Sequence, residues 1–337
     1  MEYVRLGSTG LQVSPICLGT WRFGLEHEDS GVMETDREDA HELLDALEER
    51  GGNFIDTANG YGEGRSERWI GEWLAERDRE DYVIASKCYW SDVSRFQENL
   101  SKKNVRAEVE GSLEKLGTDY LDVLYLHRFD DETPLEHTLR AVDDLVSEGK
   151  VHYVGISTCD AWKLTKGLWK ADVNNYEAFS VTQPLFHAAY YEDVAEYLDV
   201  CADQNIAVCP YSPLAGGFLT GKYERVGDGT YDLDAPEGTR ADLDEMFENW
   251  YVSERGWHVL DAVREVAEEV DASPAQVALR WLMDQRDFDC VPIVGARTVD
   301  QLDENMAAVD VSISDDQFDR IFEARYDEDG TLYRTNA

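Results

Sequence analysis

The sequence predicts an α/β protein built as a (β/α)8 TIM barrel, with an N-terminal β-hairpin cap and two extra helices. Three observations support this prediction. Short apolar or β-branched runs alternate along the chain with longer amphipathic stretches, and eight such β-then-α units follow one another without a linker or a repeat break. The 337 residues also exceed the ~250 residues of a typical barrel, which leaves room for the additions.

The runs expected to form the barrel strands are short and mostly apolar, as strands buried on both faces require. They are residues 15–19, 53–56, 82–86, 121–126, 153–156, 179–181, 206–209 and 290–294. Before the first strand, residues 3–6 and 11–13 flank a Ser-Thr-Gly turn and predict a hairpin that caps the bottom of the barrel.

Amphipathic stretches between these runs predict helices at 37–49, 66–75, 105–115, 134–147, 193–203 and 275–284. Start and stop signals accompany them: Pro134 and Pro274 at first-turn positions, and Gly51, Gly117 and Gly149 after a last turn. The two extra helices are expected at 255–270 and 315–324.

We expect one domain over 1–337, with a long Gly/Asp-rich loop at about 223–250 and a C-terminal tail at about 325–337. An open, doubly wound sheet remains the alternative, because alternation of strands and helices does not by itself show closure.

The chain carries 31 Lys and Arg residues against 71 Asp and Glu residues, which gives a formal charge of −40. Hydrophobic residues still make up 43% of it, so a large core is possible and intrinsic disorder is a poor interpretation. Nucleic acids and anionic membranes are unlikely partners, because binding a polyanion requires clustered cations. A phosphorylated ligand must be held by local cations or backbone N–H groups.

The acidic residues are spread from Glu26 to Asp329, and Arg outnumbers Lys by 22 to 9. This pattern resembles that of proteins from salt-accumulating halophiles, where molar salt shortens the screening length to roughly 3 Å. We therefore expect the fold to loosen at low salt. The alternative is an ordinary acidic mesophilic enzyme.

The six cysteines show no C-x-x-C pair or metal-like spacing, and no apolar stretch approaches the ~20 residues of a membrane-spanning helix. The sequence thus predicts a soluble, cytoplasmic protein without a metal site. It does not indicate an oligomeric state.

Three consecutive predicted strands end in titratable side chains, at the edge where a barrel of this type carries its active site. These side chains are Asp56, Lys87 and His127. Tyr61 follows on a loop bracketed by two glycines, which lets its phenol turn back over the barrel mouth. Each residue alone is usually a structural ion-pair member or a core residue, but four convergent groups indicate a catalytic site.

These four residues, called the tetrad below, suit proton transfer to or from a substrate. The ordinary pKa of a phenol is about 10, and a neighbouring ammonium, which Lys87 can supply, lowers it. Asp56 would keep Lys87 charged and oriented. His127 could bind a substrate oxygen or relay a proton.

Several long and ordered motifs include these residues: 5–21 (RLGSTGLQVSPICLGTW), 54–62 (FIDTANGYG), 86–87 (SK), 126–130 (LHRFD) and 149–157 (GKVHYVGIS). They resemble the aldo-keto reductase superfamily over nearly the whole chain. The resemblance implies that the tetrad is catalytic. It also implies a nicotinamide dinucleotide cofactor, usually NADPH, lying across the barrel mouth without a Rossmann domain.

The resemblance further implies which residues hold this cofactor. Ser157 and Gln183 match the positions that bind the carboxamide, and Tyr211 matches the aromatic residue that stacks on the nicotinamide. Residues 212–222 match the pyrophosphate segment, Arg240 would complete a belt over the cofactor, and residues 295–305 match the adenosine end. The full implied set is Thr20, Trp21, Asp56, Ser157, Gln183, Tyr211, Ser212, Leu214, Gly216, Lys222, Arg240, Gly295, Arg297, Gln301, Glu304 and Asn305.

Two positions depart from the superfamily pattern. Thr158 stands where many relatives have an Asn beside the carboxamide-binding Ser, so one amide contact is replaced by a hydroxyl or lost. Gln301 stands where strongly NADPH-selective members often carry an Arg. Arg297 could still bind a 2′-phosphate bidentately, so NADPH is favoured and NADH stays possible.

The sequence therefore predicts an oxidoreductase that reduces a small aldehyde or ketone, or oxidises the corresponding alcohol or sugar, with Tyr61 as proton donor. The alternative is a cofactor-sensing regulatory subunit, because the superfamily includes ion-channel β-subunits that keep the tetrad. Trp21 and Trp90 fall near strand ends, where they wall a substrate pocket or pack at the barrel rim. The substrate itself is not identified.

Overall fold

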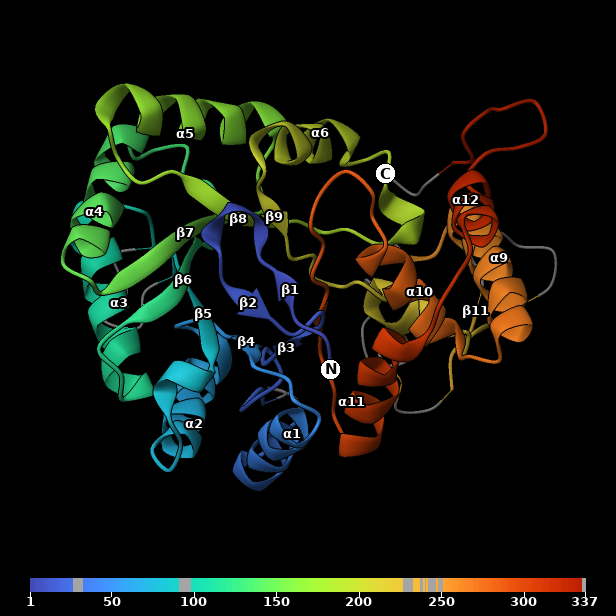
Figure 1. Cartoon of the computed structure of the whole chain (residues 1–337), viewed down its shortest axis with the longest axis horizontal. Helices are drawn as coiled ribbons and strands as arrows, with labels where there is room; N and C mark the ends of the chain where they lie inside the picture. The colour runs from blue at the N-terminus through green and yellow to red at the C-terminus, as the bar shows by residue number, and fades with distance from the viewer. Residues whose placement is uncertain are drawn as a thin grey trace. The chain divides into compact units, whose positions relative to one another are not determined.

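Eight parallel strands form one sheet in the computed structural model of this chain (Figure 1). The structure describes residues 1–26, 33–90, 98–226, 233–236, 239, 241, 247 and 251–334. The strands follow the spatial order β12, β3, β4, β5, β6, β7, β8, β9. Their bounds are β3 (Cys17–Gly19), β4 (Phe54–Asp56), β5 (Val83–Cys88), β6 (Leu121–Leu126), β7 (Val151–Ser157), β8 (Phe179–Gln183), β9 (Ala207–Val208) and β12 (Ile293–Val294).

Hydrogen bonds between the two outermost strands close this sheet into a barrel. Val208 in β9 forms a parallel bridge with Cys290, which lies just before β12. The Val208 N–H donates to the Asp289 oxygen, and the Val291 N–H donates to the Val208 oxygen, each at 2.9 Å. Because each edge strand pairs with the other, the open-sheet alternative is wrong and the (β/α)8 barrel is confirmed.

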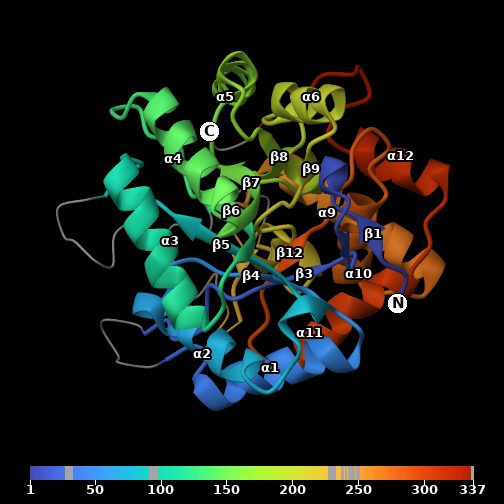
Figure 2. The same cartoon turned by 60° about the vertical axis from the view of Figure 1, so that its left-hand side comes forward.

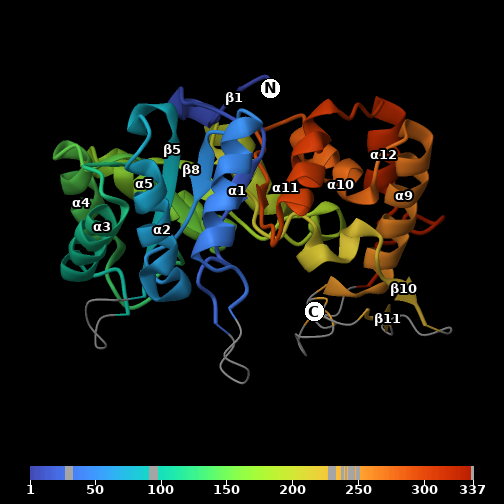
Figure 3. The ribbon, with the colours of Figure 1, turned by 90° about the horizontal axis from the view of Figure 1, so that it is seen from below.

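A hairpin of β1 (Val4–Arg5) and β2 (Gln12–Val13) covers one end of the barrel, as predicted. Leu6 and Val13 belong to the same buried cluster as the strand residues Phe54, Val123 and Val181. Figure 3 shows β1 at one end of the strands, with α1 and α2 running alongside them. The hairpin therefore seals the apolar interior at the end opposite the strand C-termini, where a barrel carries its site.

Helices surround the strands in the compact unit that holds the barrel, which comprises residues 1–184, 195–210 and 286–303 (Figure 2). They are α1 (Arg37–Glu49), α2 (Arg65–Leu74), α3 (Lys102–Leu116), α4 (Leu135–Ser147), α5 (Ala161–Asn174), α6 (Ala195–Gln204) and the start of α11 (Val299–Met306). Local signals set several ends: Asp36 caps α1 through the Glu38 and Asp39 N–H groups, and Gly117 ends α3 with φ 65°.

A second compact unit comprises residues 185–194, 211–285 and 304–337. Its described helices are α9 (Glu254–Val270), α10 (Pro274–Met283) and α12 (Asp315–Glu323), and its short strands are β10 (Glu224–Arg225) and β11 (Leu233–Asp234). Two tryptophans, Trp257 and Trp281, are buried in it, and Trp281 stacks on Phe318 at 5.3 Å. Pro274 opens α10 inside a capping box of Ser273 and Gln276.

Most predicted boundaries agree with these elements to within three residues. The two extra helices occur as α9 and α12, while α5 and α11 were not among the predicted helices. Much of the predicted loop at 223–250 and the last residues of the predicted tail lie outside the described residues, although β10 and β11 pair within that loop. Within the described ranges, no helix combines the length and apolarity needed to span a membrane.

Candidate active site

Lys87 connects two other members of the tetrad. It lies inside β5, with its side chain fully buried, and its Nζ donates to Asp56 Oδ1 at 2.5 Å and to the Tyr61 hydroxyl at 3.1 Å. A third bond, to the Thr57 carbonyl oxygen at 2.9 Å, uses the remaining N–H direction. The ammonium therefore has its three donors committed to one carboxylate, one phenol and one backbone oxygen.

Asp56, the last residue of β4, links this ammonium to the strands across the barrel. Its Oδ2 accepts from Gln183 Nε2 at 2.9 Å, and Gln183 is the last residue of β8. The Ser157 hydroxyl, at the end of β7, donates to the Gln183 backbone oxygen at 2.7 Å. The structure thus brings together two tetrad residues and the two predicted carboxamide-binding residues. Beside them, Thr158 is exposed and left-handed, with φ 47°.

The loop after β4 turns Tyr61 toward Lys87, and it depends on glycine. Gly62 has φ 56°, and a Cβ there would lie 2.3 Å from the Phe23 carbonyl oxygen. Only glycine accepts both this backbone conformation and this close approach. The glycine that the sequence placed beside the phenol therefore has a specific structural reason.

His127 and Trp90 stand beside Tyr61. The rings of Tyr61 and His127 lie edge to face at 5.9 Å, and those of His127 and Trp90 at 4.6 Å. The buried Nδ1 of His127 has no hydrogen-bond partner among the described residues. A half-buried imidazole with an unsatisfied nitrogen is a reasonable group to meet a polar atom of a substrate.

Electrostatics set the protonation states of these groups. Burial raises the pKa of Tyr61 above its ordinary value, and the Lys87 ammonium opposes this rise without cancelling it. The pKa of Tyr61 is therefore raised, whereas the sequence predicted that the Lys87 ammonium would lower it. Burial alone would lower the pKa of Lys87. The Asp56 carboxylate and the Tyr61 hydroxyl raise it by more, so the pKa of Lys87 lies above its ordinary value and Lys87 stays protonated. Tyr61 is a protonated phenol beside a cation at neutral pH.

His127 is uncharged at neutral pH. Burial, followed by the nearby Lys87 and Arg128 charges, lowers its pKa well below the ordinary range. A neutral imidazole can orient a substrate oxygen by hydrogen bonding. The low pKa disfavours the proton relay that the sequence left open.

A second ion pair, which the sequence did not reveal, adjoins the tetrad, with its carboxylate buried and its ammonium partly buried. Lys115 Nζ on α3 lies 2.8 Å from Glu67 Oε2 on α2 and donates to the Asn59 oxygen at 3.1 Å. Glu67 Oε1 accepts from the Ser86 hydroxyl at 2.6 Å. Asn59 lies two residues before Tyr61, and Ser86 directly precedes Lys87, so one ion pair contacts a neighbour of each residue in the phenol–ammonium contact.

The other predicted cofactor residues of the barrel unit lie at the ends of β3 and β12. Thr20 is buried, and its hydroxyl donates to the Asp56 oxygen at 2.9 Å, whereas Trp21 is exposed. Gly295 directly follows β12 and is exposed, and Arg297 is half-buried. The Arg297 N–H donates to Gln301 Oε1 at 2.9 Å. Thr20 thus bonds to the backbone of the strand that ends in Asp56. Trp21, Gly295 and Arg297 lie just past the C-terminal ends of β3 and β12.

The second unit holds the remaining predicted cofactor residues that the structure describes: Tyr211, Ser212, Leu214, Gly216, Lys222, Glu304 and Asn305. Gly216 has φ 65°, and a Cβ there would lie 2.7 Å from the Tyr251 ring. A Cβ on Gly217 would lie 3.1 Å from Lys222 Nζ, so a cation adjoins bare glycine backbone. Glycine backbone with a cation beside it suits a phosphate group. Arg240 lies outside the described residues.

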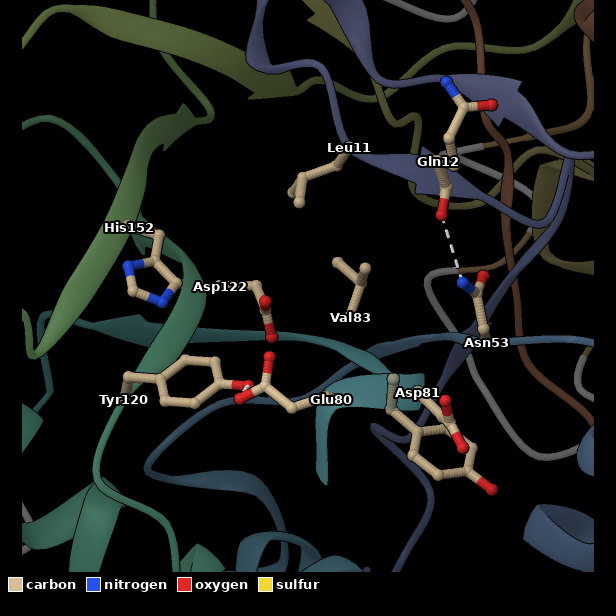
Figure 4. Close-up of a pocket in the computed structure, with 10 residues that line it drawn as sticks. Leu11, Gln12, Asn53, Glu80, Asp81, Val83, Tyr120, Asp122 and His152 are labelled. Carbon is tan, nitrogen blue, oxygen red and sulfur yellow. Dashed lines mark hydrogen bonds between the residues drawn. The ribbon is translucent and has the colours of Figure 1, made fainter. Parts of the chain in front are cut away.

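A cavity of about 300 Å³ opens at the other end of the barrel strands, near the hairpin (Figure 4). It is lined by Asp122 and Val83, at the starts of β6 and β5, and by Glu80, Tyr120 and His152 among others. Its polar groups bond to one another or to neighbours: the Tyr120 hydroxyl donates to Glu80 at 2.8 Å, and Arg79 pairs with Asp122. The cavity contains no tetrad residue. Among the described residues, no three His, Cys, Asp or Glu side chains form a group that could hold a metal ion.

Comparison with known proteins identifies extensive similarity. A model of the Aldo/keto reductase family matches residues 15–325. The chain is 37% identical to norsolorinic acid reductase B of Aspergillus parasiticus over 93% of this chain and 81% of the relative. It is 32% identical to an aryl-alcohol dehydrogenase [NADP(+)] of Phanerodontia chrysosporium, over 91% of this chain and 81% of the relative. It is also 31% identical to a probable voltage-gated potassium channel subunit beta of Arabidopsis thaliana, over 92% of each chain.

Proposed function

The chain belongs to the aldo/keto reductase family, and from that premise we propose that it reduces an aldehyde or ketone with NAD(P)H, using Tyr61 as the proton donor. The observation that carries this proposal is the three-way contact of Lys87 with Asp56, Tyr61 and the Thr57 oxygen. It pairs a protonated phenol with a permanent cation, which a proton donor needs at the moment it becomes a phenolate.

The tetrad residues divide the work as follows. When bound, a nicotinamide dinucleotide supplies the hydride that reduces the carbonyl carbon. Tyr61 transfers its proton to the carbonyl oxygen, and the Lys87 ammonium at 3.1 Å stabilises the phenolate left behind. Asp56 keeps that ammonium charged and fixed. The neutral imidazole of His127 orients the carbonyl oxygen toward the phenol.

The barrel unit offers groups that would hold part of the dinucleotide. Ser157 and Gln183 offer a hydroxyl and an amide for the carboxamide, next to the Asp56 carboxylate. Arg297 of the same unit offers a cation for a phosphate. NADPH is the favoured cofactor because Arg297 can bind a 2′-phosphate, and NADH use stays open because Gln301 is uncharged.

Aromatic carbonyl compounds are the substrate class to test first. Trp90 packs edge-on against His127, so an apolar wall adjoins the proton donor. The similar protein of Phanerodontia chrysosporium is an aryl-alcohol dehydrogenase. We therefore propose an aryl aldehyde, or the matching alcohol in the reverse direction, as the first substrate to screen.

The test replaces Tyr61 with Phe and measures turnover and cofactor binding separately. Tyr61→Phe should lower kcat by ~10² or more because the proton donor is lost. The dissociation constant for NADPH, followed by tryptophan fluorescence, should stay unchanged. Tyr89→Phe is the matched control: it removes a neighbouring phenol, which packs against Trp90, and should keep full activity.

Full activity of Tyr61→Phe would remove Tyr61 from the proposed role. A wild-type protein that binds NADPH but turns over no carbonyl in a broad panel would instead favour the regulatory-subunit alternative, because a channel β-subunit relative is among the similar proteins. The tetrad alone does not separate the two functions.

A further inference from the structure

Two arginines at the barrel mouth share one carboxylate. Arg22 NH1 forms an ion pair with Glu34 Oε2, and Arg297 Nε lies 3.3 Å from the same oxygen. The Glu34 side chain is only 8% exposed, against 16% for Arg22 and 30% for Arg297. Two guanidinium groups therefore meet on one shielded carboxylate oxygen in a chain whose formal charge is −40.

Both arginines lie just past the C-terminal ends of two neighbouring barrel strands. Arg22 follows the end of β3 by three residues, and Arg297 follows the end of β12 by three residues. These two strands are neighbours in the barrel, paired through Cys17 with Ile293 and Leu18 with Val294. In barrels of this type, phosphate groups often bind at the loops that follow the last strands.

The backbone fixes Glu34 in place. Its N–H donates to the Leu25 oxygen at 2.8 Å. The residues on either side of it form bridges, Met33 to Glu26 and Thr35 to Phe23. The carboxylate is therefore presented to the arginines by a short paired segment just before α1.

We infer that Glu34 is an internal counter-ion which occupies the arginine pair until a phosphate group of the dinucleotide displaces it. This inference rests on the proposed function, because it concerns binding of the same cofactor. The carboxylate and the phosphate compete for the same guanidinium groups. Binding breaks the contacts of Glu34 with Arg22 and Arg297 and replaces them with phosphate contacts.

Such competition reduces the apparent affinity for phosphates, because the affinity is multiplied by the fraction of molecules in which Glu34 has left the two arginines. It also makes release faster, because Glu34 returns as the phosphate leaves. Glu34 would thus determine how tightly the cofactor is held without touching the reacting atoms. Substitution of Glu34 should affect ligands with phosphates and leave unphosphorylated adenosine unchanged.

The experiment uses calorimetric titration of the full chain, at a salt concentration that keeps it folded, with three probes. ADP carries only the 5′-diphosphate, adenosine 2′,5′-bisphosphate adds the 2′ position, and adenosine carries no phosphate. Glu34→Gln should lower the dissociation constant for one or both phosphorylated probes about tenfold. The probe with the larger gain identifies whether the pyrophosphate or the 2′-phosphate competes with Glu34.

Glu26→Gln is the matched control. It removes one negative charge from the same segment, but its carboxylate lies 3.9 Å from Arg65 and is 48% exposed. No gain in Glu26→Gln, and loss of the Glu34→Gln gain in an Arg297→Gln background, would support the counter-ion role.

Three results would overturn the inference. The first is equal affinity of wild type and Glu34→Gln for both phosphorylated probes while wild type still binds NADPH, which leaves the proposed function intact. The second is an equal gain in Glu26→Gln, which would indicate a long-range charge effect. The third is a folded wild type that binds neither NADPH nor NADH, in which case the proposed function fails as well.

Discussion

Loss of the Lys87 ammonium should alter two independent measurements, folding stability and turnover. Lys87→Met removes the cation that bonds Asp56, Tyr61 and the Thr57 oxygen. Asp56 is 3% exposed, and Gln183 is then its remaining hydrogen-bond donor among the contacts described above. Breaking a buried ion pair by removing one partner destabilises a protein by ~3–5 kcal/mol, which is the loss we expect for Lys87→Met.

The double variant Asp56→Asn/Lys87→Met separates stability from chemistry. It removes both charges, and the Asn side chain can still pair with the Gln183 amide. Since replacing a whole buried ion pair is often close to neutral, the double variant should unfold within ~1–2 kcal/mol of wild type. Its turnover should stay as low as that of Lys87→Met, because the phenolate of Tyr61 still lacks its cation.

Urea unfolding in high salt, followed by the fluorescence of the nine tryptophans, provides the stability scale. Carbonyl reduction at saturating cofactor provides the activity scale. Equal stability of Lys87→Met and wild type would show that Asp56 does not depend on the ammonium, contrary to this prediction. Recovery of turnover in the double variant would equally refute the role assigned to Lys87.

Two further predictions concern pH and salt. Burial lowers the pKa of His127 and raises that of Tyr61, so kcat for reduction should be flat from pH 5 to 8 and fall only above the ordinary phenol pKa of about 10. The rate of alcohol oxidation should rise with pH. A change in the reduction rate near pH 6.5 that is lost in His127→Gln would contradict this prediction. The acidic residues that give the charge of −40 repel one another over a screening length of ~10 Å at 0.1 M salt but only ~3 Å at 1 M. The Tm measured by circular dichroism should therefore rise steeply with the KCl concentration. A constant Tm would contradict the halophile-like interpretation.

Most of the barrel could be predicted because its strands are buried on both faces and therefore read as continuous apolar runs. Helix α5 was missed for the opposite reason. Trp162 and Trp169 are each 57% exposed and Val173 is 56% exposed, so apolar residues face solvent and obscure the amphipathic period. The structure divides the chain into two compact units. The prediction of a single domain over 1–337 stays a prediction.

The tetrad could be predicted because strand ends bring distant residues to one edge of a barrel. The Glu67–Lys115 ion pair could not, because both residues have the spacing of ordinary helix-surface charges. Only the tertiary fold brings Lys115 of α3 to the Asn59 oxygen in the loop after β4. The sharing of Glu34 by two arginines was likewise invisible, because its members lie on three separate segments.

The distribution of charge is compatible with the proposed chemistry in so acidic a chain. Lys87 and Lys115 lie beside the proposed proton donor, where Lys87 pairs with the buried Asp56 and Lys115 with the buried Glu67. Because both carboxylates are buried, these two ion pairs are shielded from the field of the surface. The arginines at the barrel mouth are more exposed and lie within that field, which repels phosphates. Salt should thus act mainly on cofactor capture at the mouth, through screening, and only weakly on the proton-transfer step at Tyr61.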